Sequence, residues 1–315
     1  MTSTNKAETM PATTTTPFDL HGRKVLLATD GSAGSVAGAR IALALATTHR
    51  ATICVLNVVD TRAFPLPPAI SAFAIEGAGV NPVQANEVRA ALYTHLGVDV
   101  DWSVRIAFGT PASEIVAEAE QVDAAMIIVG LRRHGRVDRV LNDETALHVI
   151  RRASCPVLAV VPDTMELPVR VLAATDFTAA SFGAARAALA IAGAGAVLML
   201  AYVPPLTALL GDEGELYIHE LGVREAFRSA ARELGGADAT IDHVVLTQEP
   251  QDAPAQILLR YAEESNSDLI AAGSARHSRV EQWMVGSVST ELVRDGRRSM
   301  LIVPPSSPAG TPAPR

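Results

Sequence analysis

The residues best suited to chemistry are a glycine, a serine and the short run that follows them near the C-terminal end of the chain. Gly286 and Ser287 open the run "GSVST", which continues with Val288 and Ser289. A glycine lets the backbone approach a ligand closely, and amides and hydroxyls at a helix start meet an anion at the positive end of the helix dipole. Such a run suits a phosphate group, but Gly286 and Ser287 could equally be an ordinary turn and helix cap, and the residues alone leave both interpretations open.

The segment before this run carries charge that suits an anion. The loop "SARHSR" contains Arg276, His277 and Arg279, and no acidic residue follows them before Glu281. The guanidinium of Arg276 can pair with phosphate oxygens, or its bulk can crowd them. The sequence leaves both alternatives for Arg276 open.

The chain contains one pattern twice. "VLLATDGSAGS" at 25–35 matches "VLAATDFTAAS" at 171–181, which pairs Asp30 with Asp176. "ASEIVAEAEQVDAAMIIVG", ending at Gly130, matches "PAQILLRYAEESNSDLIAAG", ending at Gly273. Two matches at nearly the same separation indicate a duplication. We expect one domain over 22–162 (copy one) and a second over 168–304 (copy two), with disordered tails at 1–21 and 305–315.

Each copy alternates short apolar runs with helical patterns, which is typical of a parallel sheet covered by helices. The fold class predicted is α/β, with two tandem five-stranded parallel sheets, Rossmann-like, and helices on both faces. The strands are expected at 24–29, 52–59, 99–107, 125–130 and 156–161, and in copy two at 169–175, 196–203, 240–246, 268–273 and 300–303.

This succession resembles the universal stress protein family, on "ATDGSAGS" after the first strand, "TPASEIVAEAE" before the fourth and "RRASCPVLAVVP" at the end of copy one. The resemblance implies five-stranded parallel sheets and dimers built by pairing the last strands. It also implies that some members bind ATP through a motif G-x2-G-x9-G-[S/T], which others have lost. Within this chain, we expect the last strands of the two copies to pair about a pseudo-two-fold axis, and a homodimer of the whole chain stays open.

Copy two is similar to that motif, because Gly273, Gly286 and Ser287 stand at its spacing, with Arg276 in place of its second glycine. The resemblance implies that Asp176 and Val203 contact adenine and ribose and that Ser287 and Ser289 reach the phosphates. The full predicted site is Thr175, Asp176, Val203, Gly273, Arg276, Gly286, Ser287, Val288 and Ser289. Its expected ligand is ATP, with ADP or AMP as alternatives, and only a modest need for Mg²⁺.

Copy one departs from the motif. Gly130 is present, but Arg133, Asp143 and Glu144 stand at the places of the second glycine, third glycine and serine. "NDET", beginning at Asn142, is typical of a helix start. The acidic residues at these places would repel a polyphosphate. The repulsion between two unit charges 4 Å apart is about 4 kcal/mol if the effective dielectric constant is near 20. We expect each chain to bind one nucleotide. Gly286→Asp should abolish this binding, and Gly130→Asp should change it little.

Other functions stay in view. Asp30 and Asp176 each lie between a strand and a helix, where an aspartate is also a common helix cap. An interaction scaffold without a ligand is the main alternative to a nucleotide-binding stress or regulatory protein. Because neither "TDGSAGS" nor "TDFTAAS" carries an adenylyl-transferase or pyrophosphatase signature, an enzyme is not expected, although slow ATP hydrolysis stays open.

Composition narrows the partners. The net charge of −8 argues against nucleic-acid binding, which usually needs a basic surface. Gly193 and Gly195 interrupt the uncharged segment 187–203, so we expect no membrane span. Cys54 and Cys155 are too few for a disulfide framework and lie in apolar runs, which favours a cytoplasmic location.

Overall fold

Ten strands form one continuous sheet. The computed structural model describes residues 18–62, 82–131, 139–209, 212–235, 239–247, 252–274, 287–295 and 297–305. The strand order within these ranges is β3-β2-β1-β4-β5-β10-β9-β6-β7-β8. The strands are β1 (Lys24–Ala28), β2 (Thr52–Asp60), β3 (Ser103–Gly109), β4 (Met126–Gly130), β5 (Val157–Val160), β6 (Arg170–Ala174), β7 (Val197–Tyr202), β8 (Thr240–Val245), β9 (Leu269–Gly273) and β10 (Ser299–Val303).

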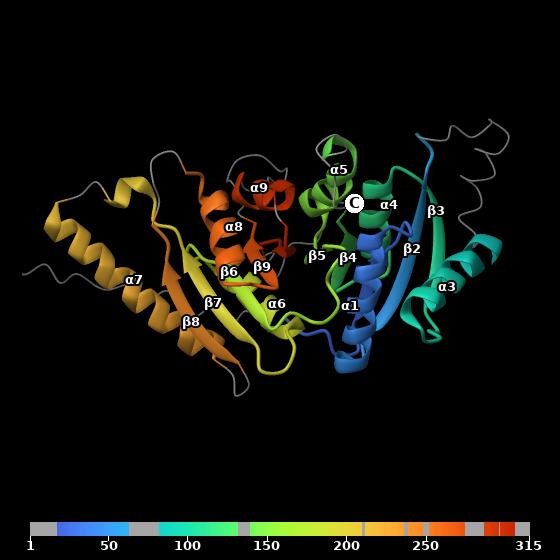
Figure 1. Cartoon of the computed structure of the whole chain (residues 1–315), viewed down its shortest axis with the longest axis horizontal. Helices are drawn as coiled ribbons and strands as arrows, with labels where there is room; N and C mark the ends of the chain where they lie inside the picture. Colours follow the sequence, from blue (N-terminus) through green and yellow to red (C-terminus); the bar gives the residue numbers. More distant parts are fainter. Residues whose placement is uncertain are drawn as a thin grey trace, which may run out of the picture.

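Helices cover both faces of the sheet (Figure 1). They are α1 (Ala33–His49), α3 (Pro82–Leu96), α4 (Pro111–Gln121), α5 (Arg139–Arg152), α6 (Ala179–Ile191), the 3₁₀ helix η1 (Leu206–Leu209), α7 (Glu213–Leu234), α8 (Pro254–Glu264) and α9 (Ser287–Asp295). The two tandem α/β copies predicted from the sequence are confirmed, and every expected strand is present. The third strand starts at Ser103 rather than at 99.

The last strands of the two copies join the sheet at its centre. Strands are parallel within each copy, but β10 runs antiparallel to β5, with Leu301 opposite Leu158. Antiparallel pairing is what a two-fold relation between the copies requires, so the predicted internal pairing is confirmed. Because each of these strands covers the other, a homodimer of the whole chain would have to use a different surface.

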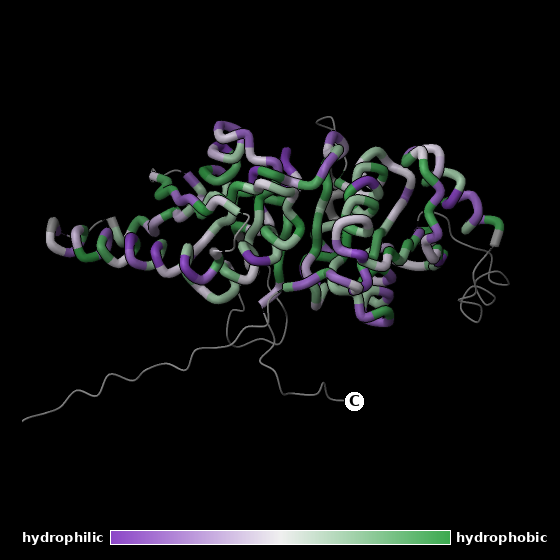
Figure 2. Tube along the Cα trace, turned by 90° about the horizontal axis from the view of Figure 1, so that it is seen from below, coloured by the Kyte–Doolittle hydropathy of each residue, from purple (hydrophilic) through white to green (hydrophobic). Residues whose placement is uncertain are grey.

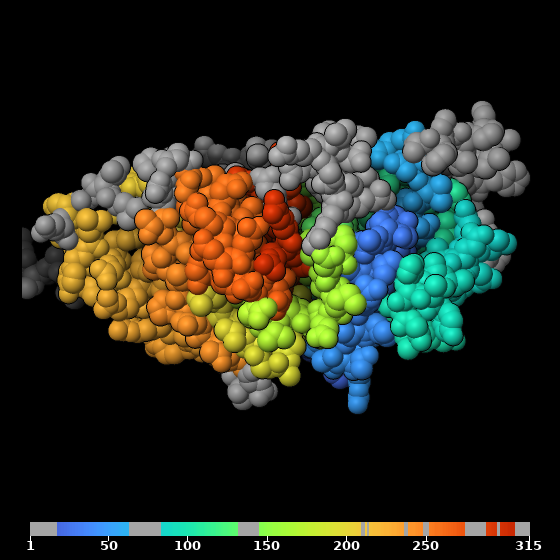
Figure 3. Space-filling model, viewed as in Figure 1, coloured from blue at the N-terminus to red at the C-terminus, as the bar shows by residue number. Residues whose placement is uncertain are grey.

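One apolar core lies on each face, and each core extends through both copies. Leu45, Leu158 and Phe227 belong to the core beneath α1, α3, α6 and α7, while Ile115 and Leu292 belong to the core on the opposite face. Figure 2 shows hydrophobic residues along the strands at the centre and hydrophilic residues along the outer helices, and Figure 3 shows the copies side by side. The two copies therefore share their packing.

The N-terminal segment and the start of α5 differ from the expectation. Leu20, in the segment 1–21 assigned to a tail by composition, is buried in the core, and Phe18 packs against it. Helix α5 begins at Arg139, so the prediction that Asn142 or Asp143 caps this helix is wrong, because both positions lie inside it. A good capping sequence does not end a helix when the residues before it also adopt helical geometry.

The shared core predicts cooperative unfolding. Leu158→Ala should lower the free energy of unfolding by about 3 kcal/mol, because it removes buried methyl groups opposite Leu301. Both copies should then unfold in one transition at a lower temperature in calorimetry. Val169→Ala, at an exposed position, is the control and should change the free energy of unfolding by less than about 0.5 kcal/mol. Two separate transitions would contradict the shared core.

Candidate nucleotide site

Two equivalent cavities lie at the carboxyl ends of the strands, one in each copy. Ligands of open α/β sheets bind where the strand order reverses, which here is between β1 and β4 and between β6 and β9. The copy-one cavity is lined by Ala28, Thr29, Asp30, Ser35, Leu56, Val58, Asp60, Arg62, Pro111, Ile115, Val129, Gly130, Thr145 and Ala146. The copy-two cavity is lined by Ala174, Thr175, Asp176, Thr178, Ala180, Ser181, Ala201, Val203, Pro254, Leu258, Ala272, Gly273, Val288 and Ser289.

Most of the predicted site residues come together in the copy-two cavity. The six that line it are Thr175, Asp176, Val203, Gly273, Val288 and Ser289. Ser287 is the first residue of α9, as the sequence predicted, and Ser289, two residues further on, is buried. Arg276 and Gly286 lie outside the described residues. The assignment of all these residues to a nucleotide stays a prediction.

A hydrogen-bonded turn fixes the aspartate of this cavity. The backbone N–H and hydroxyl of Thr178 both donate to Oδ1 of Asp176, at 3.1 and 2.6 Å. Thr178 is the N-cap of α6 and accepts a bond from the backbone of Ser181. Asp176 is therefore not the cap that the sequence allowed it to be. Its carboxylate can accept further hydrogen bonds, because two oxygens offer about four lone-pair sites.

The same turn keeps Asp176 charged. Partial burial on its own raises the pKa of Asp176, but hydrogen bonds from Thr178, Ser181 and the backbone together outweigh this effect and hold the pKa below its usual value. Burial and the negative charge of Asp176 raise the pKa of Tyr202. At neutral pH the cavity thus presents a carboxylate acceptor, which suits a ligand that offers an amine or hydroxyl donor.

Glycine at the end of β9 is required by packing. A Cβ on Gly273 would lie 2.6 Å from the backbone carbon of Ala180, and one on Gly130 would lie 2.3 Å from the backbone nitrogen of Ser35. Contacts this short force the backbone to move. Gly130→Asp would therefore disturb the start of α1 in copy one, and its expected small effect on nucleotide binding stays a prediction.

Comparisons with known proteins give the family. The model described as "Universal stress protein family" matches residues 22–161 and 169–304. The chain belongs to the universal stress protein family. A universal stress protein of Methanocaldococcus jannaschii is 31% identical over 142 residues, covering 44% of this chain and 81% of that protein. One from Mycobacterium tuberculosis is 26% identical over 302 residues, covering 91% of this chain and 98% of its own length.

A solved structure shares the tandem fold. The crystal structure of a universal stress protein from Archaeoglobus fulgidus superposes on this chain with a TM-score of 0.63 at 20% identity. The match covers 90% of this chain and 98% of that chain.

Among the residues that the structure describes in the present chain, no helix is both long enough and apolar enough to span a membrane. Both cysteines are free, and burial raises the pKa of the Cys155 thiol to about 12.

An aromatic cluster beside the site was not predicted. Phe177 adopts a left-handed conformation with φ of 63°, at the position where copy one has Gly31 with φ of 75°. The centroid of its ring lies 4.9 Å from the ring centroid of Tyr202 and 5.0 Å from that of Phe227 on α7. A bulky residue with positive φ is strained, and packing of this kind compensates for the strain. The signal in the sequence was the replacement of glycine by phenylalanine between the repeats.

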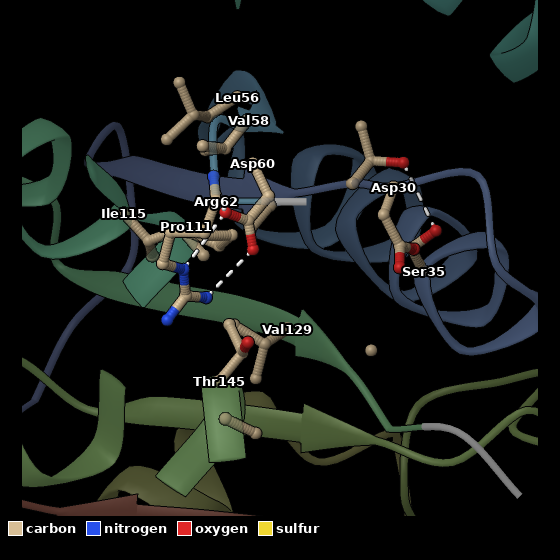
Figure 4. A pocket seen from close by; sticks show the side chains of 14 residues that line it. Asp30, Ser35, Leu56, Val58, Asp60, Arg62, Pro111, Ile115, Val129 and Thr145 are labelled. Atoms are coloured by element: carbon tan, nitrogen blue, oxygen red, sulfur yellow. Dashed lines mark hydrogen bonds and ion pairs between the residues drawn. The ribbon is translucent and has the colours of Figure 1, made fainter. Parts of the chain in front are cut away.

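Two further lining residues escaped the sequence interpretation. Asp60 and Arg62 follow the second strand of copy one and form an ion pair, with Nη2 2.9 Å from Oδ2. Figure 4 shows this pair on one side of the copy-one cavity and Asp30 and Ser35 on the other. An acid at the end of the second strand was the signal that could have identified them.

The aromatic cluster can be tested with a matched pair of variants. Phe177→Gly relieves about 1–2 kcal/mol of backbone strain but loses two aromatic contacts and buried area, so the protein should be destabilised by about 2 kcal/mol. Gly31→Ala, which meets no neighbouring atom within 4 Å, should cost about 1 kcal/mol from strain alone. Urea unfolding of both variants gives their free energies of unfolding. If Phe177→Gly were more stable than the wild type, aromatic packing would not compensate for the backbone strain.

The turn at Asp176 predicts a pH effect. Thr178→Val removes the hydroxyl donor, so the pKa of Asp176 should rise toward its unfolded value of 3.8. Because the pKa of Asp176 is lower in the folded than in the unfolded protein, its ionisation stabilises the fold at pH values above the unfolded pKa. This stabilisation is lost as the pH falls through the folded pKa. NMR titration of the Asp176 carboxyl checks the shift. Thr178→Ser keeps the hydroxyl and should leave the pKa low, whereas equal pKa values in all three proteins would contradict the prediction.

Proposed function

We propose that this universal stress protein binds one adenine nucleotide in copy two, with ATP as the first candidate and ADP or AMP as alternatives. The observation that carries the proposal is the copy-two cavity, in which the charged Asp176, Val203 and the buried Ser289 line one space at the switch point. It has a volume of about 260 Å³, slightly below the usual range of about 300–1,000 Å³ for ligand pockets. Its described part fits a base and sugar better than a whole nucleotide.

The positions of these groups support contacts of different residues with different parts of the nucleotide. Asp176 and Val203 follow neighbouring strands β6 and β7, where they would contact the base and ribose. Ser287 begins α9, so its amide and those after it are placed at the positive end of a helix, toward which phosphates would extend. Asp176 is the one carboxylate in the described lining, which supports a modest need for Mg²⁺.

We propose a regulatory role in a stress response, in which the protein holds the nucleotide rather than turning it over, and a cytoplasmic location. The free thiols of Cys54 and Cys155 support the location, since they suit a reducing compartment. An interaction scaffold is the competing function. Slow hydrolysis of bound ATP would be an addition to the binding role and not a replacement for it.

Calorimetry with ATP tests the site with matched variants from the two copies. Wild-type protein should bind one ATP per chain. Asp176→Asn keeps an oxygen that can accept the hydrogen bonds from Thr178 but removes the negative charge. It should weaken the affinity for ATP about tenfold. Asp30→Asn, the same change in copy one, should leave ATP affinity unchanged.

The phosphate end has its own variants. Gly286→Asp should abolish ATP binding, because it adds a charge and a Cβ where the backbone must approach the phosphates. Ser287→Ala should cost about 1 kcal/mol of binding free energy if its hydroxyl meets a phosphate. Two equivalent ATP sites, no heat at all, or weaker ATP binding in Asp30→Asn would each refute the proposal, and absence of heat would favour the scaffold.

A further inference from the structure

Helix α7 carries a patch of large apolar side chains that are open to solvent. Tyr217, Ile218 and Leu221 are 62%, 70% and 44% exposed, although they stand close together on one helix. No other stretch of five residues in the described part of the chain holds three large exposed apolar side chains. Apolar exposure that gathers in one place marks a surface for interaction, whereas single exposed residues are ordinary.

This patch lies on the side of α7 that faces away from the core. Phe227, Ala230 and Leu234 on the opposite side are buried, and the ring centroid of Phe227 lies 4.4 Å from that of His243 on β8. The strand order ends at β8, and Figure 1 shows α7 along this end of the molecule, at the left. The patch therefore lies on an outer face of copy two, remote from the pairing of the two copies.

The charges of α7 differ between its two halves. Residues 212–221 contain four acidic residues and neither Lys nor Arg, whereas residues 222–234 contain three arginines and two glutamates. Glu220, near the end of the first half, pairs with Arg224 at 2.8 Å, and both side chains are exposed. Arg228, one turn further on, is exposed as well. The first half is thus negative, and the second half has a small excess of positive charge.

An antiparallel second copy of the helix complements this distribution. Tyr217, Leu221, Arg224 and Arg228 recur at intervals of three and four residues, so they share one stripe of the helix. Two antiparallel helices that cross midway between Glu220 and Arg224 bring Glu220 of each chain opposite Arg224 of the other. The same crossing brings Leu221 near its own counterpart and Tyr217 opposite Arg228. A parallel copy would place acid beside acid, so the stripe complements itself in one orientation.

The opposite end of the sheet lacks this pattern. Helix α3, beside the terminal strand β3, has exposed Val83 and Tyr93 ten residues apart. Its sequence contains one acid, Glu87, and one arginine, Arg89, so its charge is not divided between two halves. Strands β5 and β10 already cover each other at the centre of the sheet. Self-association through α7 therefore closes at two chains, as an interface with two-fold symmetry does.

We propose that two chains form a homodimer in which α7 packs against α7 in antiparallel orientation. Two symmetric ion pairs join Glu220 of each chain to Arg224 of the other, and the guanidinium of Arg228 lies against the ring of Tyr217. The apolar patch is buried between the two helices. The proposal is independent of the proposed function, because no residue of α7 belongs to the described lining of either cavity.

Sedimentation equilibrium of the full chain tests the pairing by charge reversal. Wild-type protein at micromolar concentration should show twice the mass of the 33.0 kDa chain. Glu220→Arg alone and Arg224→Glu alone should each raise the dimer Kd about thirtyfold, because each places like charges opposite one another twice. An equimolar mixture of the two variants should dimerise with a Kd within about fivefold of the wild type, since opposite charges then meet at both places. The mixture cannot restore the ion pair within one helix, so recovery reports on contact between chains.

Two tyrosines provide a matched control. Tyr217→Ala should raise the dimer Kd about tenfold because it removes an aromatic ring from the interface. Tyr93→Ala, at a similarly exposed position of α3, should leave the Kd unchanged. This comparison still decides if a charge-reversal variant fails to fold by circular dichroism. A monomer throughout the micromolar range, a mixture that stays monomeric, or a dimer that Tyr217→Ala leaves intact would overturn the proposal.

Discussion

The close approach of a helix start to the last residue of a strand is the constraint on which both cavities depend. Gly273 and Gly130 have no Cβ, so the backbones at Ala180 and Ser35 lie against them at distances that no other residue permits. This approach brings the turn at Asp176 and the first residues of α6 to the carboxyl ends of β6 and β9. The glycines are therefore needed to form the cavity, whether or not they also touch a ligand.

Duplication satisfies this constraint twice and leaves the edges of each cavity to vary. Thr29 and Ser35 bond at 3.2 Å through their hydroxyls, as Thr175 and Ser181 do. The differences lie at the end of the second strand, where copy one has Asp60, and at the start of α9, where copy two has Ser287. Antiparallel pairing of β5 with β10 builds the two cavities into one sheet, so they share a core but not a ligand environment.

The frame was predictable from the sequence because it rests on local patterns. The apolar runs and the repeat located every strand, and "GSVST" located the start of α9. Tertiary packing decided the rest. The strained backbone of Phe177 is tolerated only because Tyr202 and Phe227 pack on it, and the Asp60–Arg62 pair depends on how the chain leaves β2. Neither relation has a local sequence signal strong enough to predict a contact, and a plausible cap at Asn142 misplaced the start of α5.

Comparison of the two copies also separates the residues that serve the shared fold from those found in one cavity only. Asp30 and Asp176 each accept a backbone N–H two residues further on, so both are needed for the turn before a helix, whatever binds nearby. Their presence in both copies is thus weak support for a ligand in both. Asp60 and Ser289 differ, because copy one has an alanine where copy two has Ser289, and copy two has a proline where copy one has Asp60. The frame is complete in each copy without the other's residue. The groups that only one copy has are therefore the ones by which the two cavities can differ in what they accept.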